Sequence, residues 1–576
     1  MKLRRTVLGL CCSVAFSSFA ATPVPVGRPL PVEDQGLLFI TAEYQTREQL
    51  QDIAFRFQHV IVDEASRTVR MEASFDELMA LRNAGFAARI DEKATTQLRE
   101  SEAAMAVRAT GVDGVQADPN AITGYACYRT VEETYATAQD LAMTRPQLAR
   151  VLDIGPSWAG SVNSGSGYRM RVLELTNSAT NARYPNKPSM VLFGSIHARE
   201  YTPAELLTRF AEGLANGHGT EAEATWLLDN FRFHFVLQAN PDGRKRAEAG
   251  SSWRKNINST NGSCSSSSHG IDLNRNFPFQ WNGAGSGSSS NPCAGTYRGP
   301  LRVSEPETQN LLRYVAGSPD AAGVYRGGVL PDRRGDSATS AAPSNYRGMF
   351  LDVHSYSRLV LWPWSYSTTP PPNAAALQTL GRRIAWFNGY TPKQWTGLYK
   401  ADGTTTDTMY GLLGVPSFTI ELGVAFFESC STFQNSTLPR NLSALRYAAR
   451  NLQAPYLYPA GPDTTSVRLA EGQGASGTTV TVTATIDSSR FSQANGVQSV
   501  SRVAAAHAYL NRRPWEGLAY AVQMSASDGA FSSSREVVNV TIPTSGLPSG
   551  RHVVFVRGTA ANGRVGTPQA AYFVLP

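Results

Sequence analysis

The stretch GSIHAREYTPAELL, residues 194–207, places a histidine and a glutamate at a predicted junction between a strand and a helix. The strand is predicted from the apolar run Met190–Phe193, which directly precedes the stretch. His197 and Glu200 stand three residues apart, and at this spacing the two side chains can bind one metal ion from the same side. The pair alone is a weak signal, because His-x-x-Glu occurs by chance in many sequences.

Three further stretches strengthen the metal hypothesis. They are LDVHSYSRLVLWPW (351–364), PSFTIELG (416–423) and GIDLNRNFPF (270–279). The first places His354 at the end of an apolar run, the second places Glu421 inside one, and the third carries Asn274 and Arg275. Two His and one Glu are a common ligand set for catalytic zinc that leaves a fourth position open for water. Such a site also needs an unligated carboxylate to take the proton from that water.

The order of these motifs and the residues around them resemble the M14 family of zinc carboxypeptidases, the carboxypeptidase A type, over about residues 122–457. The resemblance implies that His197, Glu200 and His354 bind one Zn²⁺. It implies that Glu421 is the general base and acid, which takes a proton from the zinc-bound water and gives it to the leaving amine. Without that role, a carboxylate inside SFTIEL is a costly buried charge. His354 taken alone is more typical of a core histidine.

Further site residues follow from the same resemblance. Arg254, in SSWRKN, polarises the scissile carbonyl and stabilises the oxyanion. Asp272 hydrogen-bonds His197 and fixes its tautomer, the alternative being a turn or capping aspartate. Asn274 and Arg275 grip the C-terminal carboxylate of the substrate, which a planar guanidinium meets with two hydrogen bonds. The other expected substrate-binding residues are Arg199, Tyr356 and Tyr399, which closes over that carboxylate unless it packs as an ordinary tyrosine.

The specificity pocket is assigned by counting along the resemblance. In family members its floor lies seven positions after the mobile tyrosine, which places Thr406 there, in the run KADGTTTDTM. A small neutral residue does not offset the desolvation of a Lys or Arg head group. We therefore expect release of neutral C-terminal residues, aromatic or large aliphatic, unless Asp402 turns toward the pocket. The residues expected nearby are Leu398, Thr404, Ser365 and Thr419.

Length and composition are those of a soluble globular protein with several domains. The chain of 576 residues is too long for one core. Hydrophobic residues make up 42% and charged residues 17%. The formal charge of +7 is a mild excess over this length. Because no Lys/Arg block is present, the excess indicates solubility and not nucleic-acid binding.

Residues 1–21 predict an export signal. The basic start KLRR precedes the apolar run Val7–Phe16, and small residues lead to a cut near Ala20 or Ala21. A membrane anchor needs about 20 continuous apolar residues, far more than this run holds. The mature protein is therefore expected to be secreted, extracellular or periplasmic, without a membrane span.

The cysteines fit an exported chain. Cys11 and Cys12 lie inside the signal, which leaves four cysteines, an even number that predicts disulfides. The resemblance pairs Cys264 with Cys293, and Cys127 with Cys430 then remain as the second pair. A cysteine-based metal site is the alternative, but the spacings contain no Cys-x-x-Cys.

The chain divides into a prosegment, a catalytic core and a β-rich tail. Residues 36–91 show the order β-α-β-β-α-β of the ferredoxin-like unit, which resembles the inhibitory prosegment of procarboxypeptidases; an unrelated α+β module is the alternative. Residues 92–121 read as a linker with cleavage points at Arg99 and Arg108. Residues 122–457 predict an α/β domain with a mixed sheet sandwiched by helices. After a linker at 458–465, residues 466–576 alternate like a β-sandwich that aids secretion, anchors the enzyme, binds a polymer or stabilises the core.

Ser/Gly-rich segments interrupt the predicted catalytic domain. Residues 258–269 and 283–291, with a longer insertion near 316–346, are polar and rich in Gly or Pro. They predict surface excursions without a chemical role.

The combined expectation is a secreted zinc metallocarboxypeptidase, made as a zymogen, that removes C-terminal residues from peptides and proteins. One alternative is an M14 relative that acts on cell-wall or other unusual peptide chain ends. Another is a catalytically inactive binding module that keeps the fold. The expected partners are peptide C-termini and an activating protease, with neither nucleic acid nor membrane, and a monomer is expected.

Overall fold

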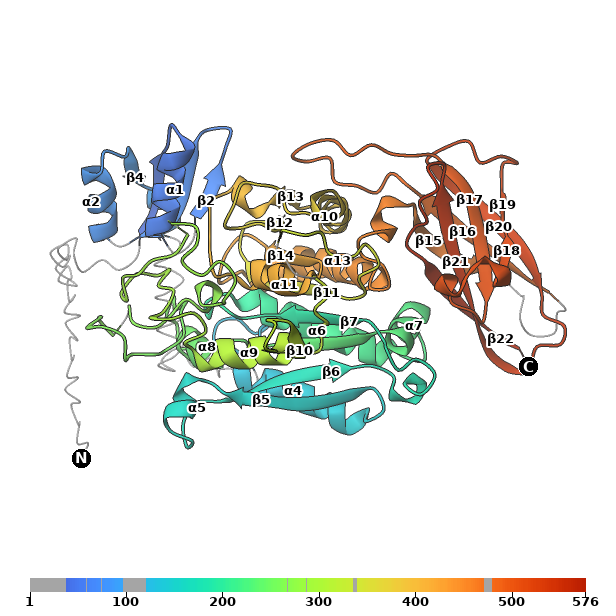
Figure 1. Cartoon of the computed structure of the whole chain (residues 1–576), viewed down its shortest axis with the longest axis horizontal. Coiled ribbons are helices and arrows are strands. Elements are labelled where there is room, and N and C mark those ends of the chain that lie inside the picture. Colours follow the sequence, from blue (N-terminus) through green and yellow to red (C-terminus); the bar gives the residue numbers. More distant parts are fainter. Residues whose placement is uncertain are drawn as a thin grey trace, which may run out of the picture.

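A computed structural model describes residues 38–57, 60–73, 75–96, 121–266, 268–285, 287–334, 339–470 and 479–575. Figure 1 shows a small N-terminal domain and a C-terminal β-sandwich on either side of a large central domain. The predicted signal, 1–21, lies outside the described residues. So does most of the predicted linker, of which residues 92–96 are helical.

The N-terminal domain has the predicted order β-α-β-β-α-β. Its elements are β1 (Leu38–Glu43), α1 (Arg47–Arg56), β2 (Val60–Asp63), β3 (Thr68–Ala73), α2 (Phe75–Asn83) and β4 (Ala88–Ile90). The strands form an antiparallel sheet in the order β2-β3-β1-β4. Helix α1 begins where the Thr46 side chain accepts a hydrogen bond from the backbone of Gln49. Alternate residues of β1 are buried in a core of their own.

The central domain is built on a mixed sheet of eight strands in the order β13-β12-β14-β11-β7-β8-β6-β5. The strands are β5 (Ala149–Pro156), β6 (Arg169–Leu175), β7 (Ser189–Phe193), β8 (Arg232–Val236), β11 (Met349–Ser355), β12 (Leu359–Trp362), β13 (Thr391–Gln394) and β14 (Ser417–Leu422). Its centre, β14-β11-β7-β8, is parallel, whereas β5 and β6 run antiparallel at one side. Strand β7 is buried along its whole length, which explains its continuous apolar sequence.

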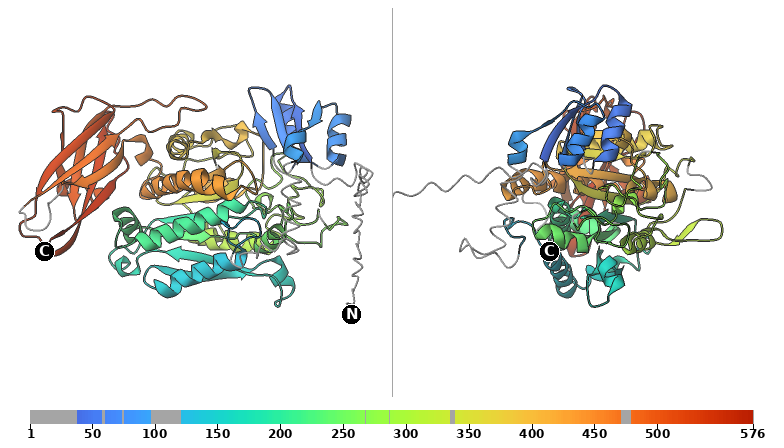
Figure 2. Two further views of the ribbon diagram at one scale, coloured as in Figure 1. Left: turned by 180° about the vertical axis from the view of Figure 1, so that it is seen from behind. Right: turned by 90° about the vertical axis from the view of Figure 1, so that its left-hand side faces the viewer.

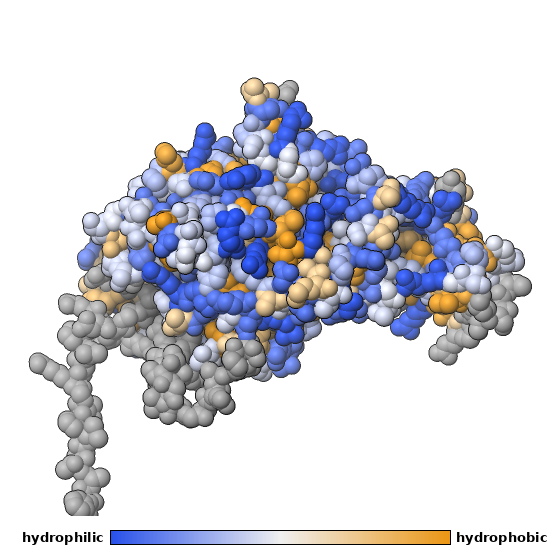
Figure 3. Space-filling model, turned by 90° about the horizontal axis from the view of Figure 1, so that it is seen from below, coloured by the Kyte–Doolittle hydropathy of each residue, from blue (hydrophilic) through white to orange (hydrophobic). Residues whose placement is uncertain are grey.

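Helices cover this sheet, which confirms the predicted fold class (Figure 2). The longer ones are α4 (Val131–Thr144), α6 (Tyr201–Gly217), α7 (Ala222–Asn230), α8 (Pro241–Glu248), α9 (Pro306–Ala316), α10 (Ala374–Asn388), α11 (Thr405–Leu413) and α13 (Leu438–Arg450). None of them, nor any other helix in the described part of the chain, has the length and apolar run that a bilayer crossing requires. Hydrophilic and hydrophobic residues are interspersed on the face seen in Figure 3.

Two disulfides lie in the central domain, and both predicted pairings are confirmed. Cys127 bonds Cys430 across a sequence separation of 303 residues, and Cys264 bonds Cys293 across 29. The first therefore ties the beginning of the domain to its end. A cross-link over so long a loop removes much conformational freedom from the unfolded chain.

The C-terminal domain consists of two four-stranded sheets with a hydrophobic core. One sheet contains β15 (Asp463–Leu469), β16 (Thr479–Asp487), β20 (Arg535–Pro543) and β19 (Ser525–Ala526). The other contains β18 (Ala521–Gln523), β17 (Val503–Leu510), β21 (Gly550–Ala560) and β22 (Gln569–Leu575). The predicted linker 458–465 is shorter than expected, because β15 already pairs with β16 from Asp463 onward.

Arginines of the central domain join it to the sandwich. The buried Arg383 donates hydrogen bonds to the carbonyls of Pro459, Gly461 and Arg490. Its neighbour Arg382 donates to four carbonyls of the segment 492–496, which connects β16 to β17. Both guanidinium groups of α10 thus donate to backbone carbonyls of the C-terminal part of the chain.

Candidate active site

Three predicted metal ligands converge at the C-terminal edge of the parallel strands. His197 follows β7, Glu200 directly precedes α6, and His354 lies near the end of β11. The Nδ1 atom of His197 lies 2.7 Å from Glu200 Oε1. The Nδ1 atom of His354 lies 3.1 Å from both Glu200 Oε2 and His197 Nδ1. All three residues are buried, and among the described residues they are the group with the geometry to hold a metal ion.

The donor set fits a divalent cation such as Zn²⁺. Two imidazole nitrogens that face each other at 3.1 Å present lone pairs to one another unless a proton or a cation lies between them. Zinc bonds of about 2.0–2.2 Å in a tetrahedron place neighbouring ligand atoms roughly 3.3–3.6 Å apart. The two contacts of His354 at 3.1 Å are close to this spacing, and the 2.7 Å contact between His197 and Glu200 is shorter. Burial raises the pKa of the Glu200 carboxyl, but the positive charges of His197 and His354 outweigh it and hold that pKa well below its ordinary value.

A carboxylate stands behind each histidine. The Nε2 atom of His197 lies 3.1 Å from Asp272 Oδ1, as the sequence predicts, and that of His354 lies 3.0 Å from Asp352 Oδ2. Each contact fixes the ring tautomer and leaves Nδ1 for the metal. Asp352 was not predicted. The sequence LDVHS indicates this residue, because residues that are two positions apart on a strand lie on the same face of the sheet.

Glu421 lies beside the ligand cluster, on β14. The parallel register pairs it with His354 of β11. Its Oε2 atom is buried and has no hydrogen-bond partner in the structure. Burial raises the pKa of Glu421 to about 7, with the charge of His354 opposing the rise and that of Glu200 adding to it. A carboxyl with a pKa near neutrality is suited to take up a proton and release it again.

Arg254 borders the same cluster. Its Nη1 atom lies 3.1 Å from His197 Nδ1, and its Nη2 atom donates to Asp272 Oδ2 at 2.8 Å. The NPDG motif positions this segment. Asn240 caps α8 by accepting from the backbone of Gly243, and its side-chain amide donates to the carbonyl of Lys255 at 3.0 Å. The guanidinium is therefore held where an oxyanion next to the metal would form.

Asn274 and Arg275 form a short turn next to the metal ligands. The Asp272 side chain starts the turn by accepting from the backbone of Asn274. Asn274 Nδ2 lies 3.2 Å from His354 Nε2, and its Oδ1 accepts from the backbone of Thr405 at the start of α11. Arg275 Nε donates to the carbonyl of Gly287 at 3.2 Å. Both side chains are buried at the site.

The Ser/Gly-rich segment 283–291 is not the surface excursion without a role that its composition predicts. Besides Gly287, which holds Arg275, it binds both carboxylate oxygens of Asp402. Ser288 Oγ donates to one, and the backbone of Ala284 donates to the other at 3.1 Å. Ser288 and Asp402 are buried. Both carboxylate oxygens of Asp402 thus accept hydrogen bonds from this segment.

The residues of the predicted specificity pocket lie together. Thr406 Oγ1 is 2.7 Å from Thr419 Oγ1, and Ser365 Oγ is 3.0 Å from Thr404 Oγ1. All four are fully buried. Sequence reasoning missed Asp407, which accepts hydrogen bonds from the backbone and hydroxyl of Ser365. Burial raises the pKa of Asp407 to about 6.

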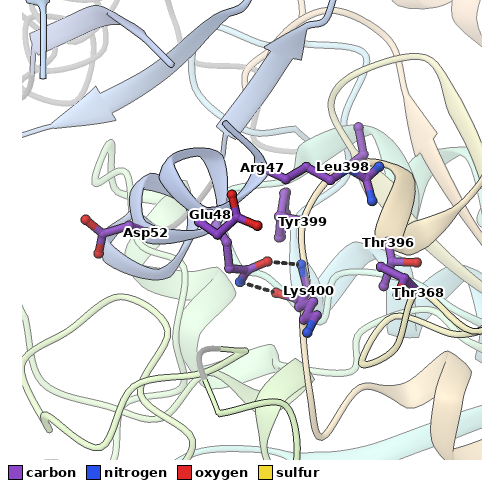
Figure 4. A pocket seen from close by; sticks show the side chains of 9 residues that line it. Arg47, Glu48, Asp52, Thr368, Thr396, Leu398, Tyr399 and Lys400 are labelled. Carbon is purple, nitrogen blue, oxygen red and sulfur yellow. Dashed lines mark hydrogen bonds between the residues drawn. The ribbon is translucent and has the colours of Figure 1, made fainter. Parts of the chain in front are cut away.

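Tyr399 faces both the site and the N-terminal domain. It lies between the turn Trp395–Gly397 and α11, next to Leu398, and packs against the N-terminal core. Burial raises its pKa; Arg275 opposes the rise and Glu421 adds to it, so its hydroxyl lies within the field of the site. Figure 4 shows Tyr399 and Lys400 beside α1. Gln51 of α1 accepts from the backbone N–H of Lys400 at 2.6 Å and donates to its carbonyl at 3.3 Å.

Arg199 is occupied by the N-terminal domain. Its Nη1 atom donates to Glu72 Oε2 of β3 at 2.8 Å, and its guanidinium lies 3.9 Å over the ring of Phe426. Tyr356 packs edge-on against the same ring, with centroids 4.8 Å apart. The two predicted substrate-binding residues Arg199 and Tyr356 are therefore neighbours, joined by Phe426, which was not predicted.

The family model of the zinc carboxypeptidases (peptidase M14) matches residues 134–435, more than half of the 576 residues. The chain belongs to this family. Carboxypeptidase A1 of Rattus norvegicus is 29% identical over 306 residues, which cover 52% of this chain and 63% of the relative. A metallocarboxypeptidase A-like protein of Trichophyton verrucosum is 30% identical over 265 residues, 46% of this chain and 53% of the relative. The chain thus spans less than two thirds of the length of these curated relatives.

Solved structures show the same fold. Carboxypeptidase A from Helicoverpa armigera superposes with a TM-score of 0.55 at 21% identity, covering 73% of this chain and 98% of that chain. Thrombin activatable fibrinolysis inhibitor (TAFI) does so with a TM-score of 0.51 at 20% identity, covering 72% and 98%. At these identities the likeness concerns the fold alone.

Proposed function

We propose that the protein is a zinc-dependent exopeptidase that hydrolyses the C-terminal peptide bond of peptides and proteins. The observation that carries this proposal is the unpartnered buried oxygen of Glu421 beside the His197–Glu200–His354 cluster. A binding module that only keeps the fold has no use for a buried carboxyl without a partner, which costs free energy. Arg254 and the Asn274–Arg275 turn complete the site with donors for an oxyanion and a carboxylate.

Each residue has a defined task in this proposal. Bound Zn²⁺ supplies a Lewis acid at the scissile carbonyl. Glu421 accepts a proton from the attacking water and returns it to the leaving amine. Arg254 donates to the carbonyl oxygen as negative charge develops there. Arg275 binds the terminal carboxylate of the substrate, and Tyr399 covers it.

The proposal also includes export of the protein, its latency and its activation. Export rests on residues 1–21, and latency rests on the N-terminal domain that occupies Arg199 and packs against Tyr399. Activation by a protease that cuts within residues 92–121 would release that domain. A monomer accounts for all of these features.

The proposed activity is tested by metal analysis together with turnover. We expect one zinc per chain, hydrolysis of a short peptide with a free C-terminus, and loss of that hydrolysis in a chelator. The same peptide with an amidated C-terminus should react at least about 100-fold more slowly, because Arg275 then has no carboxylate to bind. Zinc without turnover would favour an inactive binding module, and turnover of cell-wall peptides alone would favour unusual chain ends.

The pocket predicts a preference for neutral C-terminal residues. Thr406 and Thr419 bear no charge, and the nearby acids Asp402 and Asp407 are occupied by hydrogen bonds from Ser288 and Ser365. We expect kcat/KM for peptides that end in Phe or Leu to exceed that for Lys, Arg or Glu by about 10- to 100-fold. A tenfold preference for Lys or Arg over Phe would mean that one of these acids lines the pocket.

Asp402 is expected to position Arg275 through the segment 283–291. In Asp402→Asn the segment loses a charged acceptor, a loss of about 1.5–3 kcal/mol in hydrogen bonding, and Gly287 no longer holds Arg275 firmly. We expect KM for a C-terminal Phe peptide to rise about tenfold with kcat nearly unchanged. Ser290→Ala, an exposed change in the same segment, is the control and should leave KM as it is. An unchanged KM in Asp402→Asn would show that Arg275 needs no such support.

A further inference from the structure

Two cavities lie near each other, the first where the central domain meets the β-sandwich and the second on the central domain alone. The first, of about 340 Å³, lies between residues 180–184, α7 and the sandwich strands β21 and β22. The second, of about 490 Å³, lies at the N-terminal ends of β7 and β8. Tyr184 lines the first and the next residue, Pro185, lines the second, so the two cavities are neighbours.

Cationic side chains dominate both cavities. Arg183, Arg512, Arg513 and Arg551 line the first, and Lys187, Arg232, Arg333 and Arg347 line the second. Asp229 is the one acidic residue among the lining residues of both. We call these two cavities together the basic cleft. Charge of one sign focused between walls of low dielectric attracts ligands of the opposite sign.

Four of these eight cations hydrogen-bond uncharged acceptors, and one pairs with a carboxylate. Arg513 pairs with Glu516 at 2.7 Å, which lies beside the cleft. By contrast, Arg551, Arg347 and Lys187 donate to uncharged acceptors, which are the carbonyls of Gly219, Asn186 and Asn177. Arg333 likewise donates to the carbonyl and side-chain oxygen of Asn345. Such hydrogen bonds hold the side chains in place and leave their positive charge uncompensated.

The cations act on one another across the cleft. Burial lowers the pKa of Lys187 to about 8; the charges of Asp229 and Glu174 oppose this change, and that of Arg232 adds to it. Burial also lowers the pKa of Arg347, to which Arg513 of the sandwich contributes. That second effect shows that the central domain and the sandwich contribute to one positive field. An anion in the cleft would relieve this repulsion.

Two tyrosine rings of the first cavity are covered by arginines, and its other aromatic residues, Trp226, His552 and Phe555, are buried. Arg513 lies 3.7 Å over the ring of Tyr184, and Arg551 lies 5.0 Å over that of Tyr572. Ring faces covered in this way are not available as platforms for stacked bases, on which proteins that bind single-stranded nucleic acid rely. The chemistry offered is that of guanidinium groups, which bind sulfate, phosphate and carboxylate oxygens in pairs.

We propose that the basic cleft binds an anionic polysaccharide and so tethers the protein to it. A polymer fits better than a small anion because each of two adjoining cavities presents four cations. The placement also suits a tether. Ser189 and Arg232 begin β7 and β8 at the cleft, whereas His197 follows the opposite end of β7. A chain bound in the cleft therefore leaves the catalytic edge of the sheet open, and the inference does not depend on the proposed activity.

Binding of the full chain to immobilised heparin, alginate, neutral dextran and single-stranded DNA tests this proposal. We expect heparin, which is sulfated, and alginate, which bears carboxylates, to bind, and dextran not to bind. Affinity should fall with increasing salt, because bound counterions are released. Heparin without measurable binding in 50 mM salt, or DNA bound as tightly as heparin, would overturn the assignment.

Paired charge reversals locate the site. Arg183→Glu with Arg512→Glu, both exposed in the cleft, should weaken heparin binding about tenfold or more and reduce its salt dependence. Arg440→Glu with Arg564→Glu, also exposed but outside the cleft, makes the same change in net charge and should have a much smaller effect. Equal effects of the two pairs would show attraction by net charge alone and refute the cleft. Thermal unfolding of both variants reports that they are folded.

Discussion

Replacement of Glu421 by Gln is expected to lower kcat on a C-terminal Phe peptide by about 10³- to 10⁴-fold, which is the contribution of a well-placed general base and acid. The amide has the size of the carboxyl but takes up no proton. The three ligands His197, Glu200 and His354 are untouched, so zinc content should equal that of the wild type. Turnover with metal analysis on the same sample measures both quantities.

A control substitution at a second buried carboxyl, Glu428, distinguishes loss of proton transfer from a general loss of structure. Glu428 is buried seven residues beyond Glu421, and its Oε1 atom accepts from the backbone of Val424 at 3.0 Å. The amide of Glu428→Gln keeps an acceptor there, and kcat should change by no more than a few-fold. Near wild-type kcat in a zinc-loaded Glu421→Gln variant would remove Glu421 from the role of base.

Removal of the N-terminal domain is expected to raise kcat/KM on short peptides by about 100-fold. The domain binds Arg199 through Glu72 and the Lys400 backbone through Gln51, and the proposed latency requires that both contacts break before a substrate enters. If the open form is populated at about 1%, the full chain shows about 1% of the activity of the open form, which is a reduction of about 100-fold. The measurement compares the full chain with a chain cut once within residues 97–120. Equal kcat/KM for the two forms would contradict latency.

The Glu72–Arg199 pair is the contact to test within the uncut chain. Burial raises the pKa of Glu72, and Arg199 opposes that rise, so the pair is a desolvated one. Glu72→Gln should weaken the hold and raise the activity of the full chain several-fold, since the loss of one partner of a buried pair is costly. Glu43→Gln, an exposed change on the same sheet, should leave activity unchanged.

The convergence of His197, Glu200 and His354 was predictable because local sequence determines where strands end. Continuous apolar runs identify β7, β11 and β14, and parallel neighbours bring their C-terminal ends to one edge. His354 lies on β11 itself, and His197 follows the end of β7 closely, so both reach this edge. Asp352 lay within reach of the same reasoning, since the period of a strand places it on the face of His354.

The remaining site features depend on contacts between distant parts of the chain. Asp402 meets Ser288 across a separation of 114 residues, and Glu72 meets Arg199 across 127. Composition describes 283–291 only as polar and Gly-rich, because a loop takes its shape from its partners and not from a repeat. No periodic pattern encodes such pairings, so the sequence predicts the residues that bear the chemistry better than those that hold them.

The arginines of α10 also determine how the molecule comes apart. Arg382 and Arg383 find their acceptors in residues 459–496, so removal of residues 459–576 takes away the hydrogen bonds of both guanidinium groups. A hydrogen bond to a charged group contributes about 1.5–3 kcal/mol. The catalytic domain and the sandwich should therefore melt in a single cooperative transition, as one folding unit. The N-terminal domain, with a core of its own, is free to detach before that transition and leave the rest intact.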